Sequence, residues 1–354
     1  MFATVILVCK FRNSAVKAYM CPKRAASVVA RKKYSFEGVR KMKYCELLNE
    51  WLQESVKPTV KKRTYDRYDQ LVRCHLKPAL GECHVEELTE LTLRKYVSEL
   101  SENGNLVRSG GLSHSTVNII ITVIQNSLKY ACSAKKIKKY VAGGLIRPKL
   151  SQKKIEVFTV SEQRKLERVL LSDPESKMFG VVLCLYTGMR VGELLALKWE
   201  NVDVKNGTIE INGTCYDDKS EDGGYKRVIG TPKTLSSCRL IPLPRQIIPL
   251  LCEHGNRRSS EFVIVNESGS PIGVRSYQKS FEILLECVGI KKRCFHALRH
   301  TFATRALECG MDVKTLSEIL GHHNATVTLN RYAHSLIEHK KEMMNRVGKL
   351  LWYR

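Results

Sequence analysis

A glycine- and lysine-rich stretch at residues 141–156 divides this chain into two segments, each of which must bury an apolar core of its own. The stretch contains Gly143, Gly144 and Pro148 together with several lysines, so it offers little apolar surface to bury. With 354 residues, the chain is also longer than one ordinary domain. We therefore expect two domains that are joined by a linker over 141–156.

The first segment carries apolar residues at helical spacing, which predicts a small bundle of about four helices. The second of these helices is expected to open within 59–65 and to be broken by Pro78 and Gly81, and the third to cover 92–100. Ser113 or Ser115 can cap the fourth. The expected buried faces are Leu47, Leu48, Trp51 and Leu52 in the first helix, and Val117, Ile120, Ile121, Ile124 and Leu128 in the fourth.

The second segment changes its pattern twice. Thr159 or Ser161 can cap a helical region that continues to about Lys198. Residues 207–243 then read as strands, with alternation over 208–211 and a short apolar run over 239–243. Helices return from about residue 275. The expected fold is therefore mainly α, with a small antiparallel β-sheet in the second domain, which makes that domain α+β.

The two ends of the chain differ from its interior. Residues 1–40 are basic and lack a sustained period, so we expect a poorly ordered arm or an over-extended start, with Met42 as a possible true start. The apolar run at 2–9 follows no basic residue, which argues against a signal peptide. The expected organisation is an arm at 1–40, a helical domain at 41–140, the linker at 141–156, a second domain at 157–345 and a tail at 346–354.

Charge and cysteine usage narrow the class of protein. The chain has 59 Lys and Arg residues against 35 Asp and Glu residues, a formal net charge of +24. Such an excess favours a polyanionic partner such as nucleic acid over a merely soluble basic protein. The 13 cysteines include no C-x-x-C pair and fit a reducing cytoplasm, and Cys184, Cys252 and Cys287 are expected to be buried thiols. No run reaches the ~18–20 apolar residues that a membrane span needs.

Two motifs offer cations. In Thr-Gly-Met-Arg-Val-Gly-Glu-Leu, a glycine turn places Arg190 just before a new helix, and Glu193 follows three residues later, close enough to hold a basic group. A guanidinium can bind two phosphate oxygens at once, although an arginine at a helix start is more often a surface ion pair. Lys233 stands in Pro-Lys-Thr between two expected strands. An ammonium there is normally solvated, but beside other cations it can become a proton donor.

Two later motifs offer imidazoles and a phenol. In Phe-His-Ala-Leu-Arg-His-Thr, His296 and Arg299 are three residues apart and share one helical face. In Leu-Gly-His-His, Gly321 ends a helix and exposes His322, and Tyr332 follows ten residues later. Most tyrosines are packing residues, and a phenol is a poor nucleophile unless cations stabilise its phenolate. The spacing shows no metal-ligand pattern, and we expect neither a metal nor a cofactor.

Taken in this order, the motifs resemble those of the tyrosine recombinase, or phage integrase, family. The resemblance is strong over about 158–345 and weaker over 42–140, where it implies a SAM-like core-binding domain. It implies that Arg190 and Arg299 clamp the scissile phosphate, Lys233 protonates the leaving 5′ oxygen, and His296 assists proton transfer. It further implies that His322 binds the phosphate and that Tyr332 forms a 3′-phosphotyrosyl bond, with Glu193 and His334 as supporting residues.

Competing residues lie within the same motifs. His300 and His323 are alternatives to the assigned histidines, but His322 follows the glycine directly and fits the motif better. Tyr353 is the other tyrosine after Tyr332 and has no motif around it. The family's small β-rich domain, which reads arm-type sites, shows no signal in 1–40.

The helical domain supplies candidate contacts to core-site DNA. A basic stretch and the start of the fourth expected helix could bind phosphates and base edges, or could simply be solvated polar faces. The candidates are Lys61, Lys62, Arg63, Thr64, Tyr68, Ser115, Thr116 and Asn118.

The expected function is that of a site-specific recombinase, an integrase of a phage or integrative element. Its partners would be double-stranded core-site DNA, further copies in a tetrameric synaptic complex, and an excisionase or host DNA-bending factor. The alternatives are a chromosome-dimer-resolving recombinase, a type IB topoisomerase and a DNA-binding relic without activity. The apolar residues after Tyr332 could pack on a neighbouring copy or on their own domain.

Overall fold

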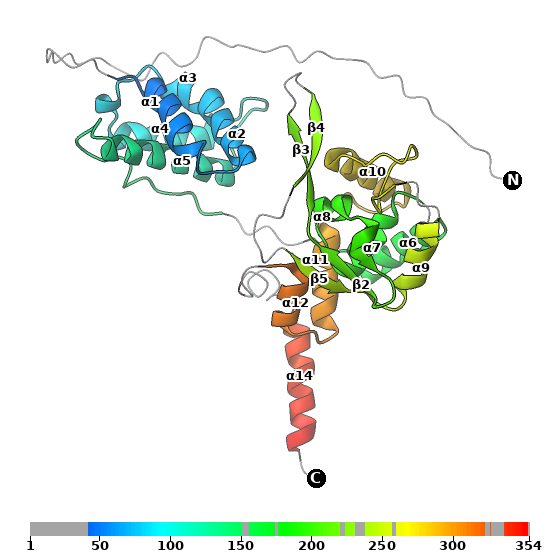
Figure 1. Ribbon diagram of the computed structural model, residues 1–354. Coiled ribbons are helices and arrows are strands. Elements are labelled where there is room, and N and C mark those ends of the chain that lie inside the picture. The colour runs from blue at the N-terminus through cyan, green and yellow to red at the C-terminus, as the bar shows by residue number, and fades with distance from the viewer. Residues whose placement is uncertain are drawn as a thin grey trace, which may run out of the picture. The chain divides into compact units, whose positions relative to one another are not determined.

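The computed structural model describes residues 42–150, 156–173, 176–219, 224–230, 238–256, 260–322, 326 and 336–352. The chain separates near residue 152 into two compact units, each with its own buried cluster (Figure 1). The expected arm at 1–40 lies outside the described residues. No helix among the described segments is both long and apolar enough to cross a membrane.

The N-terminal unit is a bundle of short helices, as predicted. Its longer helices place apolar faces against one another, and the faces predicted for the first and fourth helices are buried. Ser113 caps the last helix by accepting a hydrogen bond from the backbone N–H of Thr116. The elements are α1 (Tyr44–Trp51), η1 (Leu52–Val56), α2 (Lys62–Leu71), η2 (Val72–Leu76), α3 (Lys77–Leu80), η3 (Val85–Glu87), α4 (Glu90–Asn103) and α5 (His114–Ser133).

Pro78 does not break the second helix, contrary to the sequence-based expectation. The chain stays helical from Lys62 to Leu80, passing through a π-helical turn at η2 before α3 begins. Pro78 lies in the first turn of α3, directly after the π-helical turn, and a proline is tolerated in the first turn of a helical segment.

The first half of the expected linker packs along α5 instead of standing clear of it. Ala142 and Leu145 belong to the N-terminal core, so the expectation that this stretch buries little is wrong for these two residues. Arg147 donates hydrogen bonds to the carbonyl of Asn118 at 3.1 Å and to Oε1 of Gln125 at 2.8 Å. This part of the chain is therefore attached to the N-terminal unit.

The C-terminal unit combines helices with two small antiparallel sheets. One sheet has the strand order β1-β2-β5 and aligns Ile209 with Ile241, while β3 and β4 form a separate two-stranded ladder. The elements are α6 (Val160–Leu171), α7 (Phe179–Thr187), α8 (Val191–Ala196), η4 (Trp199–Asn201), β1 (Val202–Asp203), β2 (Thr208–Ile211), β3 (Thr214–Lys219), β4 (Tyr225–Gly230), β5 (Arg239–Pro242), α9 (Ile247–Asn256), α10 (Val274–Cys287), α11 (His296–Glu308), α12 (Val313–Leu320) and α14 (Leu336–Leu351).

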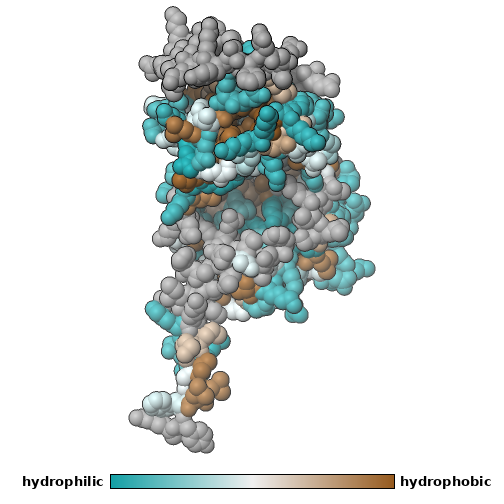
Figure 2. Space-filling view, turned by 90° about the vertical axis from the view of Figure 1, so that its left-hand side faces the viewer, coloured by the Kyte–Doolittle hydropathy of each residue, from teal (hydrophilic) through white to brown (hydrophobic). Residues whose placement is uncertain are grey.

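The final helix, α14, leaves apolar side chains in solvent. It contacts α11, yet Met344, Leu350 and Leu351 remain exposed, and Trp352 just beyond the helix is exposed as well. Figure 2 shows brown, apolar side chains gathered on the surface of the helix α14. An apolar face of this kind is a candidate contact surface.

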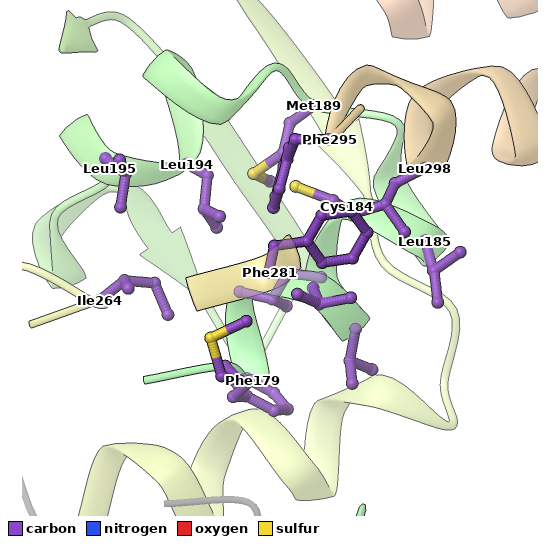
Figure 3. Packing of buried hydrophobic residues seen from close by; sticks show 14 of the residues in the cluster. Phe179, Cys184, Leu185, Met189, Leu194, Leu195, Ile264, Phe281, Phe295 and Leu298 are labelled. Atoms are coloured by element: carbon purple, nitrogen blue, oxygen red, sulfur yellow. The ribbon is translucent and has the colours of Figure 1, made fainter. Parts of the chain in front are cut away.

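The core of the C-terminal unit is built around α7, which is apolar on all sides and therefore buried. Phe179 and Cys184 of this helix belong to the same cluster as Phe281 and Phe295 (Figure 3). The rings of Phe281 and Phe295 meet edge to face with centroids 5.1 Å apart. Because α7 packs against α11, this core fixes two of the elements that carry the motif residues.

The prediction of buried cysteines is confirmed in one case and wrong in two. Cys184 is fully buried in α7. Cys252 and Cys287 are exposed because they lie on the solvent faces of the amphipathic helices α9 and α10. A short apolar run does not by itself tell the two faces of such a helix apart.

Candidate active site

The turn between α7 and α8 presents Arg190 at the edge of the core. Gly188 ends α7 with φ +64°, a left-handed conformation that favours glycine, and a Cβ there would lie 2.4 Å from Cδ1 of Phe302. Arg190 then occupies the N-cap position of α8. Its side chain is 36% exposed, so the guanidinium can still reach a ligand.

Glu193 holds Arg190 from the first turn of α8, as the spacing predicts. The backbone N–H of Arg190 donates to Oε2 of Glu193 at 2.9 Å, and Nη1 donates to Oε1 at 2.6 Å. Glu193 itself is only 5% exposed. A charged group this deeply buried needs a strong partner to remain ionised.

A second arginine, Arg239 of β5, supplies most of that compensation. Its Nη2 donates to Oε2 of Glu193 at 2.9 Å and its Nη1 donates to Oε1 at 3.2 Å. Burial raises the pKa of Glu193, but the hydrogen bonds and charge of Arg239, followed by the charge of Arg190, bring that pKa below its ordinary value. Glu193 is therefore a carboxylate shared by two guanidinium groups.

Arg299 is fixed in the interior between two turns. It is 2% exposed, and its Nη1 donates to the carbonyl of Gly188 at 2.9 Å. Its Nη2 donates to the carbonyl of Leu320 at 2.7 Å and approaches Nε2 of His322 at 2.9 Å. Since a guanidinium only donates, Nε2 of His322 is the acceptor in this contact.

The turn after α12 brings the separate motifs together. Gly321 caps α12 with φ +63° and directs the chain so that His322 reaches Arg299. The carbonyl of Gly321 accepts a hydrogen bond from Nη2 of Arg190 at 3.4 Å. Arg190, Arg299 and His322 are thus gathered around one turn, although more than 130 residues separate the first from the last.

His296 lies at the first position of α11 and is exposed. Its ring meets the ring of His300 edge to face, with centroids 4.6 Å apart. Lys233, Tyr332 and His334, together with the competing His323 and Tyr353, lie outside the described residues. Within the described segments, no group of three His, Cys, Asp or Glu side chains is placed to hold a metal ion.

Arg239 is the residue of this cluster that sequence reasoning missed. The sequence places it at the start of the run Arg-Leu-Ile-Pro-Leu, where a charged residue at a strand end is ordinarily solvated. Arg239 lies six residues after Lys233, and this closeness to the lysine motif could have marked it as a candidate site residue. Pairing of β5 with β2, which sets Ile211 opposite Arg239, is what turns the residue into the core.

The candidate DNA contacts of the N-terminal unit fall into two groups. Lys61, Lys62, Arg63 and Thr64 are exposed at the start of α2, and Ser115 is exposed at the start of α5. The other three make contacts within the unit. Tyr68 stacks on Trp51 with centroids 6.0 Å apart, Thr116 bonds with the hydroxyl of Ser113, and Asn118 donates to the carbonyl of Pro148 at 3.1 Å.

Family models match both units. The model described as phage integrase family matches residues 162–339, which is half of the chain. The model described as phage integrase, N-terminal SAM-like domain matches residues 44–101.

Relatives that align over most of this chain are also named recombinases or integrases. A protein named tyrosine recombinase XerC-like from Caldanaerobacter subterraneus subsp. tengcongensis is 29% identical over 336 residues, covering 86% of this chain and 82% of that protein. The integrase of Staphylococcus phage L54a is 25% identical over 353 residues, covering 90% and 96%. The ICEBs1 integrase of Bacillus subtilis is 23% identical over 298 residues, covering 81% and 78%.

Solved structures share the fold. The Tn1549 transposon integrase in complex with transposon right-end DNA aligns with a TM-score of 0.73 at 23% identity, covering 87% of this chain and 100% of that chain. A lambda integrase dimer bound to a core site aligns with a TM-score of 0.62 at 16% identity, covering 82% and 77%. The predicted fold class is confirmed by these likenesses.

Proposed function

The chain belongs to the phage integrase family, and we propose on that premise that it breaks and rejoins DNA at specific sites through a 3′-phosphotyrosyl bond on Tyr332. The relatives that it matches are tyrosine recombinases and integrases of phages and integrative elements. The single observation that carries the assignment is the meeting of Arg190, Arg299 and His322 at the turn after α12.

The proposed reaction needs only side-chain chemistry. The phenol oxygen of Tyr332 attacks the phosphorus, the bond to the 5′ oxygen breaks, and Lys233 gives a proton to that leaving oxygen. Arg190 and Arg299 bind the non-bridging oxygens as charge builds on the five-coordinate phosphorus, and His322 orients the phosphate. His296, at the exposed start of α11, assists proton transfer by taking up the proton that the phenol loses as it attacks.

Rejoining is the same step in reverse with a different strand. The 5′ hydroxyl of the partner strand attacks the phosphotyrosine and releases the phenol of Tyr332. Because each phosphodiester is exchanged for a phosphotyrosine and back, the reaction conserves the bond energy and requires no nucleotide hydrolysis.

The position of Arg299 has a chemical advantage. Its guanidinium is fixed by the carbonyls of Gly188 and Leu320, so its orientation does not depend on the DNA. Preorganised charge of this kind stabilises a transition state without reorganising at the moment of reaction. Arg190 is partly exposed, so its side chain can adjust to the position of the phosphate.

The N-terminal unit supplies DNA affinity in this proposal. The exposed residues Lys61, Lys62, Arg63, Thr64 and Ser115 lie at the starts of α2 and α5 and would contact core-site DNA. The net charge of +24 implies binding that weakens steeply with salt. Tyr68, Thr116 and Asn118 would act through the elements they pack against, because their side chains already have partners within the unit.

Assembly of four copies on DNA is part of the proposal. A lambda integrase that shares the fold has been solved as a tetramer bound to a Holliday junction. The exposed apolar side chains of α14 offer a surface for contact between copies. An excisionase or host DNA-bending factor would act on this complex, and the setting is the cytoplasm, where the DNA substrate lies.

Covalent capture on a pool of duplexes tests the proposal and identifies the recognised sequence in the same experiment. Duplexes with a nick and randomised flanks trap a recombinase, because the short strand released after cleavage diffuses away. DNA retained on denatured protein is then sequenced. We expect an adduct from the wild type and from Tyr353→Phe, and none from Tyr332→Phe.

Each outcome separates the alternatives. An adduct that persists in Tyr332→Phe would refute the nucleophile, and the absence of an adduct from the wild type would favour a DNA-binding protein without activity. The sequence that is captured distinguishes roles, since an integrase selects sequences found at the ends of its own element and a dimer-resolving recombinase selects a chromosomal site.

A further inference from the structure

Arg239 is a buried cation whose three nitrogen positions all have acceptors. Its side chain is 6% exposed. Nη1 and Nη2 donate to the two carboxylate oxygens of Glu193, and Nε donates to the carbonyl of Ile319 at 2.5 Å. These contacts use three of the five N–H groups of Arg239 and direct its guanidinium toward Glu193 and the end of α12. Its role must be exerted through the residues it holds.

The Ile319 contact completes a pattern at the end of α12. The carbonyls of Ile319, Leu320 and Gly321 are consecutive, and each accepts a hydrogen bond from a different arginine: Arg239, Arg299 and Arg190 respectively. The last carbonyls of a helix lack partners within the helix and carry its partial negative charge. The end of α12 therefore gathers three guanidinium groups around the turn that presents His322.

Packing leaves little freedom in this arrangement. A Cβ at Gly321 would lie 3.0 Å from Cδ and Nη1 of Arg239, so glycine is needed there for space as well as for its positive φ. The backbone of Arg239 is held by the pairing of β5 with β2. Arg239 thus joins a strand, the first turn of α8 and the end of α12.

We propose that Arg239 is a positioning residue for strand cleavage: it keeps Glu193 in place to orient Arg190, and it holds the α12 turn that presents His322. The role rests on the proposed function. It predicts that removal of Arg239 slows the chemical step and leaves DNA binding intact, because the side chain is almost fully buried and adds little to the charged surface.

The charge balance at Glu193 gives a readout that a purely structural role would not move. In Arg239→Met, the buried carboxylate keeps one cation in place of two, so its pKa rises. Protonation of Glu193 releases Arg190, hence the active form is the deprotonated one. Cleavage by this variant should therefore increase with pH through a new inflection above the ordinary glutamate pKa of about 4.3.

The experiment measures single-turnover cleavage of the captured nicked duplex, and its affinity for the protein, from pH 5 to pH 9. For Arg239→Met we expect cleavage at pH 7 to fall about 10–100-fold, the size typical of partners that orient functional groups. Affinity should stay within about threefold of the wild type, and the double variant Arg239→Met/Glu193→Gln should lose the new inflection. Arg245→Met is the matched control, since Arg245 is an exposed arginine just beyond β5, and it should cleave as the wild type does.

Arg239→Lys keeps the fold testable if the methionine variant melts below the assay temperature. Lysine retains the cation but cannot bond both carboxylate oxygens and Ile319 at once, so cleavage should fall with affinity unchanged. Wild-type rates in both variants, or an affinity loss that matches the rate loss, would overturn the positioning role. No adduct from the wild type in the parallel reaction would overturn the proposed function itself, and this role with it.

Discussion

The two units of this protein differ in how far the cationic side chains assigned to DNA are exposed to solvent. At the start of α2 in the N-terminal unit, Lys61, Lys62 and Arg63 are exposed to solvent. In the C-terminal unit, Arg239 and Arg299 are almost fully buried and each bonds backbone carbonyls. An exposed cation attracts DNA and adjusts to it, whereas a buried one has a fixed direction before DNA arrives. In the proposed function, this contrast gives DNA affinity to the N-terminal unit and strand cleavage to the C-terminal unit.

The substitution Arg299→Met should have the largest effect on cleavage, and it tests whether a buried cation serves the chemistry. We expect cleavage to fall about 10²–10³-fold, the cost of losing one preorganised donor at a transition state. Stability should also fall by about 1–3 kcal/mol, because the carbonyls of Gly188 and Leu320 lose their donor. Single-turnover cleavage and denaturant unfolding measure the two effects.

Arg305→Met is the control for that variant. Arg305 lies on the same helix, α11, and also donates to a carbonyl, that of Phe158 at 3.0 Å. It should share the stability loss and keep its cleavage rate at saturating DNA. Equal cleavage rates for Arg299→Met and Arg305→Met would show that burial of Arg299 serves the fold alone.

Glu193→Gln should have the next largest effect. It leaves Arg239 buried without its counterion, which costs about 3–5 kcal/mol when one partner of a buried pair is removed. Cleavage should fall about 10–100-fold, because Arg190 loses the carboxylate that orients it. Chemical unfolding and single-turnover cleavage are the measurements, with Glu200→Gln on the exposed η4 turn as the control.

The loss of stability at acid pH gives a second test of the ionised state of Glu193. The pKa of Glu193 is lowered in the folded protein, so its stabilising contribution is present above the ordinary pKa of about 4.3 and is lost as pH falls toward the folded value. Unfolding measured from pH 6 down to pH 3 should show a shallower loss in Glu193→Gln than in the wild type. An identical slope would mean that Glu193 is not the ionised partner described here.

Gly321→Ala tests the turn on which the buried cations converge. A left-handed backbone at a residue with a Cβ costs of order 1–3 kcal/mol, and the added methyl also meets Arg239. The melting temperature and the cleavage rate should fall together. Gly310→Ala, which changes another positive-φ glycine with open space around it, should lower the melting temperature and leave cleavage unchanged.

The smallest effect on chemistry belongs to the exposed face. Replacing Lys61, Lys62 and Arg63 by alanine should leave cleavage at saturating DNA unchanged. The slope of log affinity against log salt should become shallower by up to about 3, since each phosphate contact contributes roughly 0.9. Fluorescence anisotropy across a salt series measures it, and an unchanged slope would remove this face from the DNA interface.

Local patterns carried most of what could be predicted. Thr159 caps α6 with Glu162 in a capping box, and the apolar face of α5 is buried as its spacing requires. The order of the motifs also indicated that Arg190, Arg299 and His322 would share a site. These features depend on residues within a few positions of one another, or on a resemblance to a known family.

Long-range contacts account for what the sequence did not reveal. Arg239 reads as a strand-end charge, and only the pairing of β5 with β2 and its contact with α12 carry it inward. The burial of Arg299 could not be predicted from the sequence either. An arginine followed by a histidine is expected on the polar face of a helix of mixed composition. Pro78 shows the same limit, since its place in α3 depends on the π-helical turn before it.

The carbonyls at the end of α12 also determine when two arginine side chains lose their rotamer entropy. A flexible arginine carries about 2 kcal/mol of rotamer entropy, which is lost whenever its guanidinium is brought into one orientation. For Arg239 and Arg299 this loss occurs when the C-terminal unit folds, because Ile319 and Leu320 already bond them. The binding energy of DNA therefore need not be used to order these two side chains.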